Sequence, residues 1–133
     1  SILPGLLKQE KNPFIKLGMR LVAPTMFRKY PYKELYLMHA AKQFKNAVKC
    51  NLIYIGGAST TESLAQVMNE GFDFVQVARP LLRDPEMVNH LNEYGSQYIN
   101  GCTHCNECAP LMDDPNGIRC VLPKWNNAVS IQQ

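Results

Sequence analysis

Two consecutive β-α units between residues 51 and 85 constrain the fold of this chain more than any other feature. An apolar run at 52–55 leads into a glycine pair and an amphipathic run that ends at Gly71, and a second apolar run at 74–77 follows at once. Short, almost wholly apolar strands separated by one helix are typical of parallel sheets that helices cover on both faces. The sequence therefore predicts an α/β fold with two parallel strands joined by a right-handed crossover.

Polar residues at the helix ends predict where the two helices begin. Ser59 is the expected N-cap of the helix between the strands, and Glu62 three residues later would complete a capping box. After the second strand, Asp84 and Pro85 have the residue types of an N-cap and a first-turn proline. One helix is thus expected to start at the glycine turn after the first strand, and another at Asp84, after the second strand.

The residues at these strand ends predict an anion site. Gly56 and Gly57 follow the first strand, and Arg79 follows the second. Ligands of parallel α/β folds gather at the carboxyl ends of strands, and β/α barrels often bind phosphate in the loops after the last two strands. Amides of the glycine turn, the helix start at Ser59 and Thr60, and the guanidinium would all attract an anion. Each feature alone is also common in α/β proteins without a phosphate site, but together they favour one.

These residues also resemble a known family. The resemblance rests on the run Gly-Phe-Asp-Phe-Val-Gln-Val-Ala-Arg-Pro-Leu-Leu-Arg-Asp-Pro, preceded by Ile-Tyr-Ile-Gly-Gly and followed by a cysteine cluster. Such a run resembles the carboxyl-terminal portion of the NADH:flavin oxidoreductases of the Old Yellow Enzyme type, from about Tyr32 to Leu122. The resemblance implies the last two β-α units of a TIM (β/α)8 barrel within residues 1–100, and a cysteine-rich tail at 101–133.

The resemblance further implies a flavoprotein that carries FMN. In the family, the flavin phosphate lies between the glycine turn after the seventh strand and a small-residue–arginine pair after the eighth. The corresponding positions here are Gly56, Gly57, Ala78 and Arg79. The implied enzyme is an ene-reductase: NAD(P)H reduces the flavin, and the flavin passes hydride to a small unsaturated carbonyl compound.

The catalytic and substrate-binding groups of this family come from earlier strands of the barrel. No such strands are found before residue 32, and a complete barrel needs about 200 residues or more. We therefore expect no catalytic residue in this chain. It is expected to be a carboxyl-terminal fragment of a longer flavoprotein, or a truncated product, and inactive by itself.

Four cysteines near the carboxyl end form a second candidate site. They have the pattern C-x2-C-x2-C, with a fourth cysteine after eleven further residues: Cys102, Cys105, Cys108 and Cys120. Closely spaced thiols of this kind are more often metal ligands than disulfide partners inside cells, and thiolates bind zinc or iron-sulfur centres. Relatives similar to 2,4-dienoyl-CoA reductase and trimethylamine dehydrogenase carry a [4Fe-4S] cluster here, with one residue more between the second and third cysteines. A [4Fe-4S] cluster, a zinc site and unligated thiols all stay open.

Composition sets the remaining expectations. A net charge of +3 over 133 residues is too small to indicate a nucleic-acid or membrane partner. The sequence has no apolar run of membrane-spanning length and no signal-peptide pattern, which favours a cytoplasmic protein. Two alternatives to the flavin enzyme remain: a non-catalytic zinc or iron-sulfur module, and a non-functional truncated product.

Overall fold

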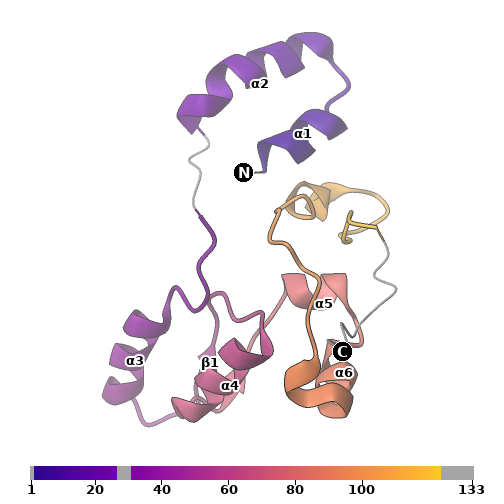
Figure 1. Cartoon of the computed structure of the whole chain (residues 1–133). Helices are drawn as coiled ribbons and strands as arrows, with labels where there is room; N and C mark the ends of the chain where they lie inside the picture. The colour runs from indigo at the N-terminus through magenta and orange to yellow at the C-terminus, as the bar shows by residue number, and fades with distance from the viewer. Residues whose placement is uncertain (1, 27–30, 124–133) are drawn as a thin grey trace. The chain divides into compact units, whose positions relative to one another are not determined.

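The computed structural model describes residues 2–26 and 31–123 (Figure 1). These residues form two compact units. The helical unit contains the described residues up to Pro31 together with 103–123, and the β-α unit contains 32–102. The sequence predicted a boundary at residue 100 between a barrel portion and a cysteine-rich tail, and this boundary stays a prediction.

The helical unit consists of three helical segments: α1 (Leu3–Gln9), α2 (Pro13–Met26) and the 3-10 helix η2 (Ala109–Asp113). Close packing joins α1 to η2, since a Cβ atom on Gly5 would lie 2.7 Å from Cγ of Pro110. An ion pair at 3.2 Å between Lys8 and Glu107 adds a surface contact.

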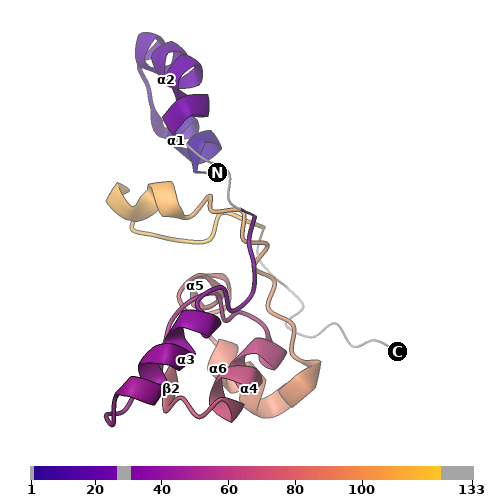
Figure 2. The ribbon, with the colours of Figure 1, turned by 90° about the vertical axis from the view of Figure 1, so that its left-hand side faces the viewer.

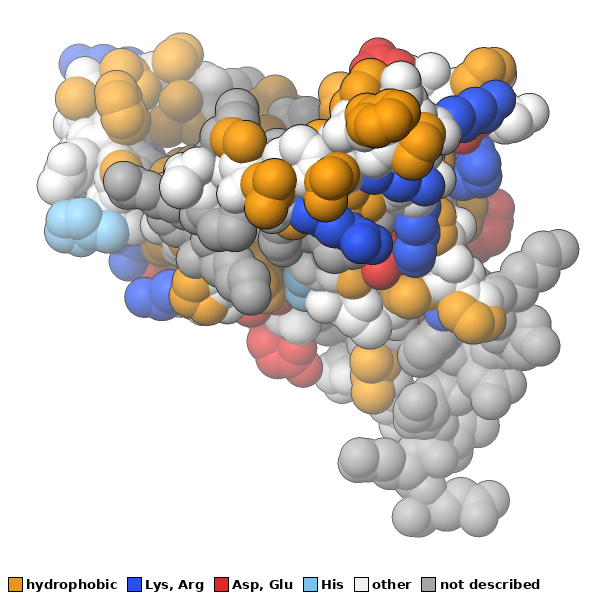
Figure 3. All heavy atoms as spheres, turned by 90° about the horizontal axis from the view of Figure 1, so that it is seen from above, with side chains coloured by type: hydrophobic (Ala, Val, Ile, Leu, Met, Phe, Trp, Pro, Cys, Tyr) orange, Lys and Arg blue, Asp and Glu red, His pale blue; other side chains and the backbone are white. Residues whose placement is uncertain are grey.

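Figure 3 looks down on the molecule from above and shows exposed apolar side chains beside basic ones. On α2 the exposed apolar side chains include Phe14 and Leu21. Among the described residues, no helix combines the length and apolar character needed to cross a bilayer.

The β-α unit has the predicted alternation of strands and helices. Its elements are α3 (Met38–Ala47), β1 (Ile53–Tyr54), α4 (Thr61–Asn69), β2 (Phe74–Val75), α5 (Arg79–Arg83), α6 (Met87–Tyr94) and the 3-10 helix η1 (Gly95–Gln97). The two strands pair in parallel, with Ile53 opposite Phe74 and Tyr54 opposite Val75. The predicted parallel pair joined by one helix is therefore confirmed.

The core of this unit lies where α3 and α4 meet the strands. Five buried residues form it, from α3, from α4 and from the segments around both strands: Met38, Tyr54, Ala58, Val67 and Phe72. The rings of Tyr54 and Phe72 pack edge to face with their centroids 5.4 Å apart. Figure 2 shows this unit from the side, with α3 in front. Burial of the aromatic pair and of Val67 fixes α4 against the strands.

The opposite face of the strand pair is open. Ile53 is 60% exposed, Ile55 56% and Phe74 56%, although all three side chains are large and apolar. Successive strand side chains point to opposite faces: Tyr54 lies in the packed core, and Val75, its partner on β2, packs against that core. The sequence predicted strands covered on both faces, and within the described residues only one face is covered.

Both predicted helix starts are shifted along the chain. The N-cap of α4 is Thr60, whose side chain accepts a hydrogen bond from the Ser63 amide at 3.1 Å, and Ser63 completes the capping box. The predicted box of Ser59 and Glu62 is wrong by one residue, because the Ser59 hydroxyl bonds elsewhere. Helix α6 starts at Met87, not directly after Asp84, since the Asp84 amide instead closes α5.

Candidate anion site at the strand ends

The turn after β1 requires glycine at both of its positions. Gly56 has φ +141° and Gly57 has φ +81°, backbone conformations that other residues rarely adopt. The loop before α3 also approaches the turn closely. A Cβ atom on Gly56 would lie 2.8 Å from Cβ of Leu37, and one on Gly57 would lie 2.9 Å from Cδ1 of Tyr36 and 3.0 Å from the Lys33 carbonyl oxygen. The glycine pair thus serves conformation and close packing together.

Hydrogen bonds hold that loop against the turn. The Tyr32 hydroxyl lies 2.8 Å from the Gly57 carbonyl oxygen, 2.9 Å from Oε1 of Glu34 and 3.0 Å from Oγ of Ser59. The amide of Leu35 also donates to the Gly57 carbonyl, at 3.1 Å. Burial, assisted by the Glu34 carboxylate, raises the pKa of Tyr32 to about 12 against the lowering effect of Ser59 and Arg79. The hydroxyl therefore keeps its proton at neutral pH and can donate it to the Gly57 carbonyl oxygen or to the Glu34 carboxylate.

A carboxylate of the chain itself bonds to Ser59. The Glu34 carboxylate accepts a hydrogen bond from the Ser59 amide at 3.3 Å and another from the Ser59 hydroxyl. The Ser63 hydroxyl oxygen in turn accepts from the amides of Ser59 and Thr60, each at 3.0 Å. The sequence predicted that the helix start at these two residues would contribute to the anion site. In the structure their amides are already bonded within the chain.

The second half of the predicted site lies at the carboxyl end of β2. Ala78 is the N-cap residue of α5 and is exposed, and Arg79 is half-buried in the first turn. The guanidinium carbon of Arg79 lies over the Tyr32 ring, 5.7 Å from its centroid. The same tyrosine bonds to Gly57 through its hydroxyl. Tyr32 therefore connects the glycine turn after β1 with the arginine after β2.

Tyr32 and Glu34 were missed by the sequence reasoning. Both lie in a loop about 25 residues before the glycine turn, and neither belongs to a motif with a fixed spacing. A hydroxyl, a carboxylate and an aromatic ring become part of the site only when the loop folds over the turn. We find no signal in the local sequence that would have identified them.

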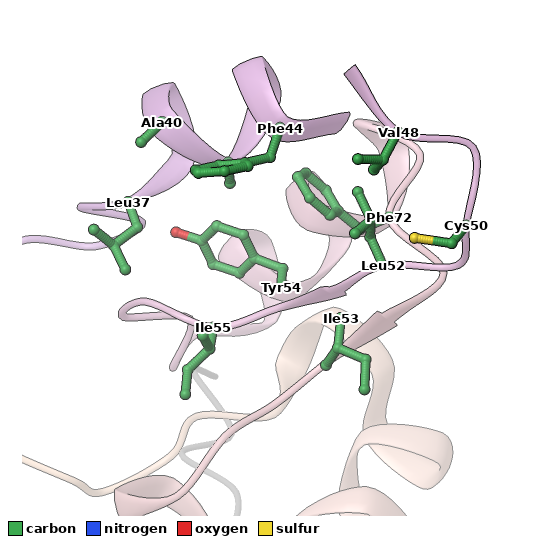
Figure 4. Close-up of a pocket in the computed structure, with 11 residues that line it drawn as sticks. Leu37, Ala40, Phe44, Val48, Cys50, Leu52, Ile53, Tyr54, Ile55 and Phe72 are labelled. Atoms are coloured by element: carbon green, nitrogen blue, oxygen red, sulfur yellow. The ribbon is translucent and has the colours of Figure 1, made fainter. Parts of the chain in front are cut away.

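An apolar pocket lies beside β1 in the same unit. It has a volume of about 400 Å³ and is lined by side chains from α3, from β1 and from the segment before β1 (Figure 4). Phe44 and Val48 come from or follow α3, and Leu52, Ile53 and Ile55 come from the strand region. The lining offers hydrophobic contacts and no charged group. It is therefore suited to packing apolar side chains rather than to chemistry.

The cysteine segment begins at a well-bonded residue. The Cys102 amide donates to Oδ1 of Asn100 at 3.0 Å, and Nδ2 of Asn100 donates to the Pro80 carbonyl at 3.1 Å. Further along, His104 and Asn106 have positive φ angles of 54° and 62°. One side chain, that of Asn100, thus joins the first predicted metal ligand to α5.

The predicted ligand set is divided between the two units. Cys102 belongs to the β-α unit, and Cys105, Cys108 and Cys120 belong to the helical unit. Cys105 is exposed, and the other three are half-buried. The thiol donors have the chemistry for zinc or iron. Within residues 2–26 and 31–123, however, no three cysteine, histidine or acidic side chains are gathered as ligands of one metal ion. Metal binding by this segment stays a prediction.

Another buried polar cluster was not predicted. The Asp84 carboxylate is 9% exposed and accepts from the Tyr98 hydroxyl at 2.7 Å, from Nδ1 of His90 at 2.8 Å and from the Glu86 amide at 3.1 Å. Burial alone would raise the pKa of Asp84, but the bonds from Tyr98 and His90 hold it below its usual value. The cluster ties α5 and α6 to the segment that leads to the cysteines.

This chain is similar in sequence to known redox enzymes. It is 38% identical over 106 residues to 4,4'-dithiodibutanoate disulfide reductase of Rhodococcus erythropolis, covering 79% of this chain and 25% of that protein. It is 27% identical over 93 residues to NADH oxidase of Thermoanaerobacter brockii, covering 69% of this chain and 14% of that protein. It is 29% identical over 93 residues to bilirubin reductase of Mediterraneibacter gnavus, covering 68% of this chain and 14% of that protein.

These relatives are oxidoreductases. The general redox character that the sequence predicted is thereby supported. The chain spans a quarter or less of the length of the relatives it matches. No protein-family model matches the chain, and no solved structure matches it.

Proposed function

We propose that the chain is the phosphate-binding part of an FMN-dependent oxidoreductase of the ene-reductase type. One observation carries the proposal. Two parallel, hydrogen-bonded strands end in a glycine turn and an arginine, and Tyr32 contacts both Gly57 and Arg79. Similarity to oxidoreductases, one of them named for NADH, supports a redox role with NAD(P)H as reductant. A small unsaturated carbonyl compound is the proposed substrate.

The backbone at the strand ends supports a phosphate ligand. Within the described residues, no hydrogen bond is seen for the amides of Gly56, Gly57 and Ala78. These amides can therefore donate to an anion at the carboxyl ends of adjacent strands, which is the usual ligand position in parallel α/β folds. The Glu34 carboxylate beside Ser59 weakens the local positive field, so the charge of Arg79 becomes decisive for holding a phosphate.

We further propose that β1 and β2 are neighbouring strands of a β/α barrel. The open apolar face at Ile53, Ile55 and Phe74 has the character of a barrel interior, which side chains from the other strands fill. The apolar pocket between α3 and β1 is consistent with packing against a further strand. This arrangement would bury side chains that the described residues leave exposed.

In this proposal the chain contributes binding and orientation. FMN, when bound, supplies hydride transfer. Gly56, Gly57, Ala78 and Arg79 would hold its phosphate through amides and one guanidinium, and so fix the position of the cofactor. None of the described residues is proposed as a proton donor or a substrate ligand.

A second proposal concerns the cysteine segment. A [4Fe-4S] cluster or a zinc ion at Cys102, Cys105, Cys108 and Cys120 would act with the flavin site or, if flavin is absent, as a separate module. The observation in its favour is the backbone on both sides of Cys105, where His104 and Asn106 have positive φ angles. Such conformations cost roughly 1–3 kcal/mol each and cluster at functional sites.

The phosphate proposal is tested by Arg79→Met in the protein at its native length. Loss of a charge-assisted partner worth about 1.5–3 kcal/mol should weaken FMN binding roughly 10- to 150-fold, measured by flavin fluorescence titration. Binding of riboflavin, which lacks the phosphate, should change less than about twofold. Arg119→Met is the matched control, because Arg119 pairs with Asp114 on the surface of the helical unit. Unchanged FMN affinity in Arg79→Met would rule out the phosphate assignment.

A further inference from the structure

We infer that Tyr32 is a positioning residue, whose ring holds the Arg79 guanidinium in place for the phosphate. The inference rests on the proposed function and adds to it a residue outside both strand ends. Tyr32 lies in the loop before α3, and the site predicted from the sequence contains no residue of that loop. Its contacts to the turn and to the arginine involve different parts of one side chain.

The hydroxyl end of Tyr32 is fixed to the turn after β1. It lies within hydrogen-bond distance of the Gly57 carbonyl, the Ser59 hydroxyl and the Glu34 carboxylate. Three polar neighbours at 2.8–3.0 Å restrict both the rotation of the side chain and the position of its ring. The ring is therefore a fixed surface rather than a freely moving one.

The other contact is the face of that ring with Arg79. A guanidinium within about 6 Å of an aromatic centroid is attracted by the negative face of the ring, and the separation here is 5.7 Å. Arginine has a long side chain with many rotamers, and each rotamer lost on binding a ligand lowers affinity. A ring that restricts the guanidinium before the phosphate arrives reduces that loss.

Glu34 places a negative charge in the part of the site that follows β1. Its carboxylate is bonded to Ser59, so it belongs to the half of the site that follows β1. A carboxylate and a phosphate are both anions, so both can attract a guanidinium. Contact with the Tyr32 ring holds the guanidinium over the aromatic face, at the carboxyl end of β2.

The test is a double-mutant cycle on the protein at its native length, read as the ratio of FMN to riboflavin affinity. Tyr32→Leu should lower this ratio about 3- to 30-fold, because only FMN has the phosphate that Arg79 binds. In the Arg79→Met background the same substitution should lower it less than twofold. Tyr94→Leu removes a tyrosine of α6 that packs on His90, and it should leave the ratio unchanged.

Tyr32→Phe keeps the ring and removes the hydroxyl, so it should retain more of the FMN preference than Tyr32→Leu. An equal loss of affinity for both flavins would mean that Tyr32 only supports the fold, and it would overturn the inference. So would equal effects of Tyr32→Leu with and without Arg79. If Arg79→Met itself leaves the ratio unchanged, the phosphate proposal fails as well.

Discussion

Removal of the Asp84 carboxylate should destabilise the β-α unit strongly. The carboxylate is almost fully buried and accepts three hydrogen bonds, two of them from the side chains of Tyr98 and His90. A bond to a charged group contributes about 1.5–3 kcal/mol, and each buried donor left unsatisfied costs about 1–3 kcal/mol. Because Asn100 still donates to the Tyr98 hydroxyl oxygen, part of the cluster survives. We expect Asp84→Ala to lower the free energy of unfolding by about 3–5 kcal/mol.

Asp84→Asn separates charge from shape. The amide oxygen can still accept from the Glu86 amide. The NH2 group, however, faces the Tyr98 hydroxyl and the His90 ring, which donate to the carboxylate in the wild type, so the free energy of unfolding should fall by about 1–3 kcal/mol. The assay is chemical unfolding of the protein at native length, followed by circular dichroism. Asp113→Asn, at an exposed position of the helical unit, should change the unfolding free energy by less than about 0.5 kcal/mol. Equal stabilities of Asp84→Ala and wild type would refute this reading of the cluster.

The same carboxylate gives a pH dependence with a defined sign. Its pKa in the folded protein is lower than in the unfolded chain, where an aspartate titrates near 3.9. Its contribution is therefore fully present above about pH 5 and is lost as the pH falls through the lower folded pKa. The stability difference between wild type and Asp84→Asn should shrink as the pH falls below about 4. A difference that grows in acid would contradict the assignment.

Two further substitutions test the glycine turn and the cysteine segment. Gly57→Ala combines a left-handed backbone with close contacts to Tyr36 and the Lys33 carbonyl, so it should lower the unfolding free energy by about 2–4 kcal/mol. Gly117→Ala, at φ +77° in open space, should cost only about 1–2 kcal/mol, and equal losses would argue against close packing at the turn. Cys105→Ser should remove bound iron or zinc, measured by elemental analysis, while FMN stays bound. Metal content that is unchanged in this variant would exclude Cys105 as a ligand.

The order of elements could be predicted because local patterns specify it. Two apolar runs of strand length predict β1 and β2, and the amphipathic segment between them, which ends at a glycine, predicts α4. The structure confirms that the two strands pair in parallel. Gly56 and Gly57 were identifiable for the same reason. Their positive φ angles leave few alternatives to glycine.

Contacts between distant parts of the chain could not be predicted. Ser59 is not the N-cap because Glu34, 25 residues earlier, bonds to its hydroxyl. Asp84 ends α5 through its amide, and its carboxylate bonds to Tyr98, 14 residues later. A single sequence shows the polar residue but not its partner. The contact between Arg79 and the Tyr32 ring could not be predicted for the same reason, since it depends on how one loop folds over a turn.

The open strand face marks another limit of local reasoning. An all-apolar strand predicts burial on both faces, but it does not identify the element that covers each face. Here α3 and α4 pack against one face, while Ile53 and Phe74 stay exposed on the other. The barrel proposal accounts for this difference, since the exposed face would then point to the barrel interior.

The absorption spectrum of the protein at its native length tests most directly whether the strand ends hold the phosphate of FMN. The protein is purified, its visible spectrum is recorded, and any released chromophore is identified by mass. We predict flavin absorption and release of FMN rather than riboflavin or a dinucleotide. A colourless protein that also fails to take up added FMN would contradict the account.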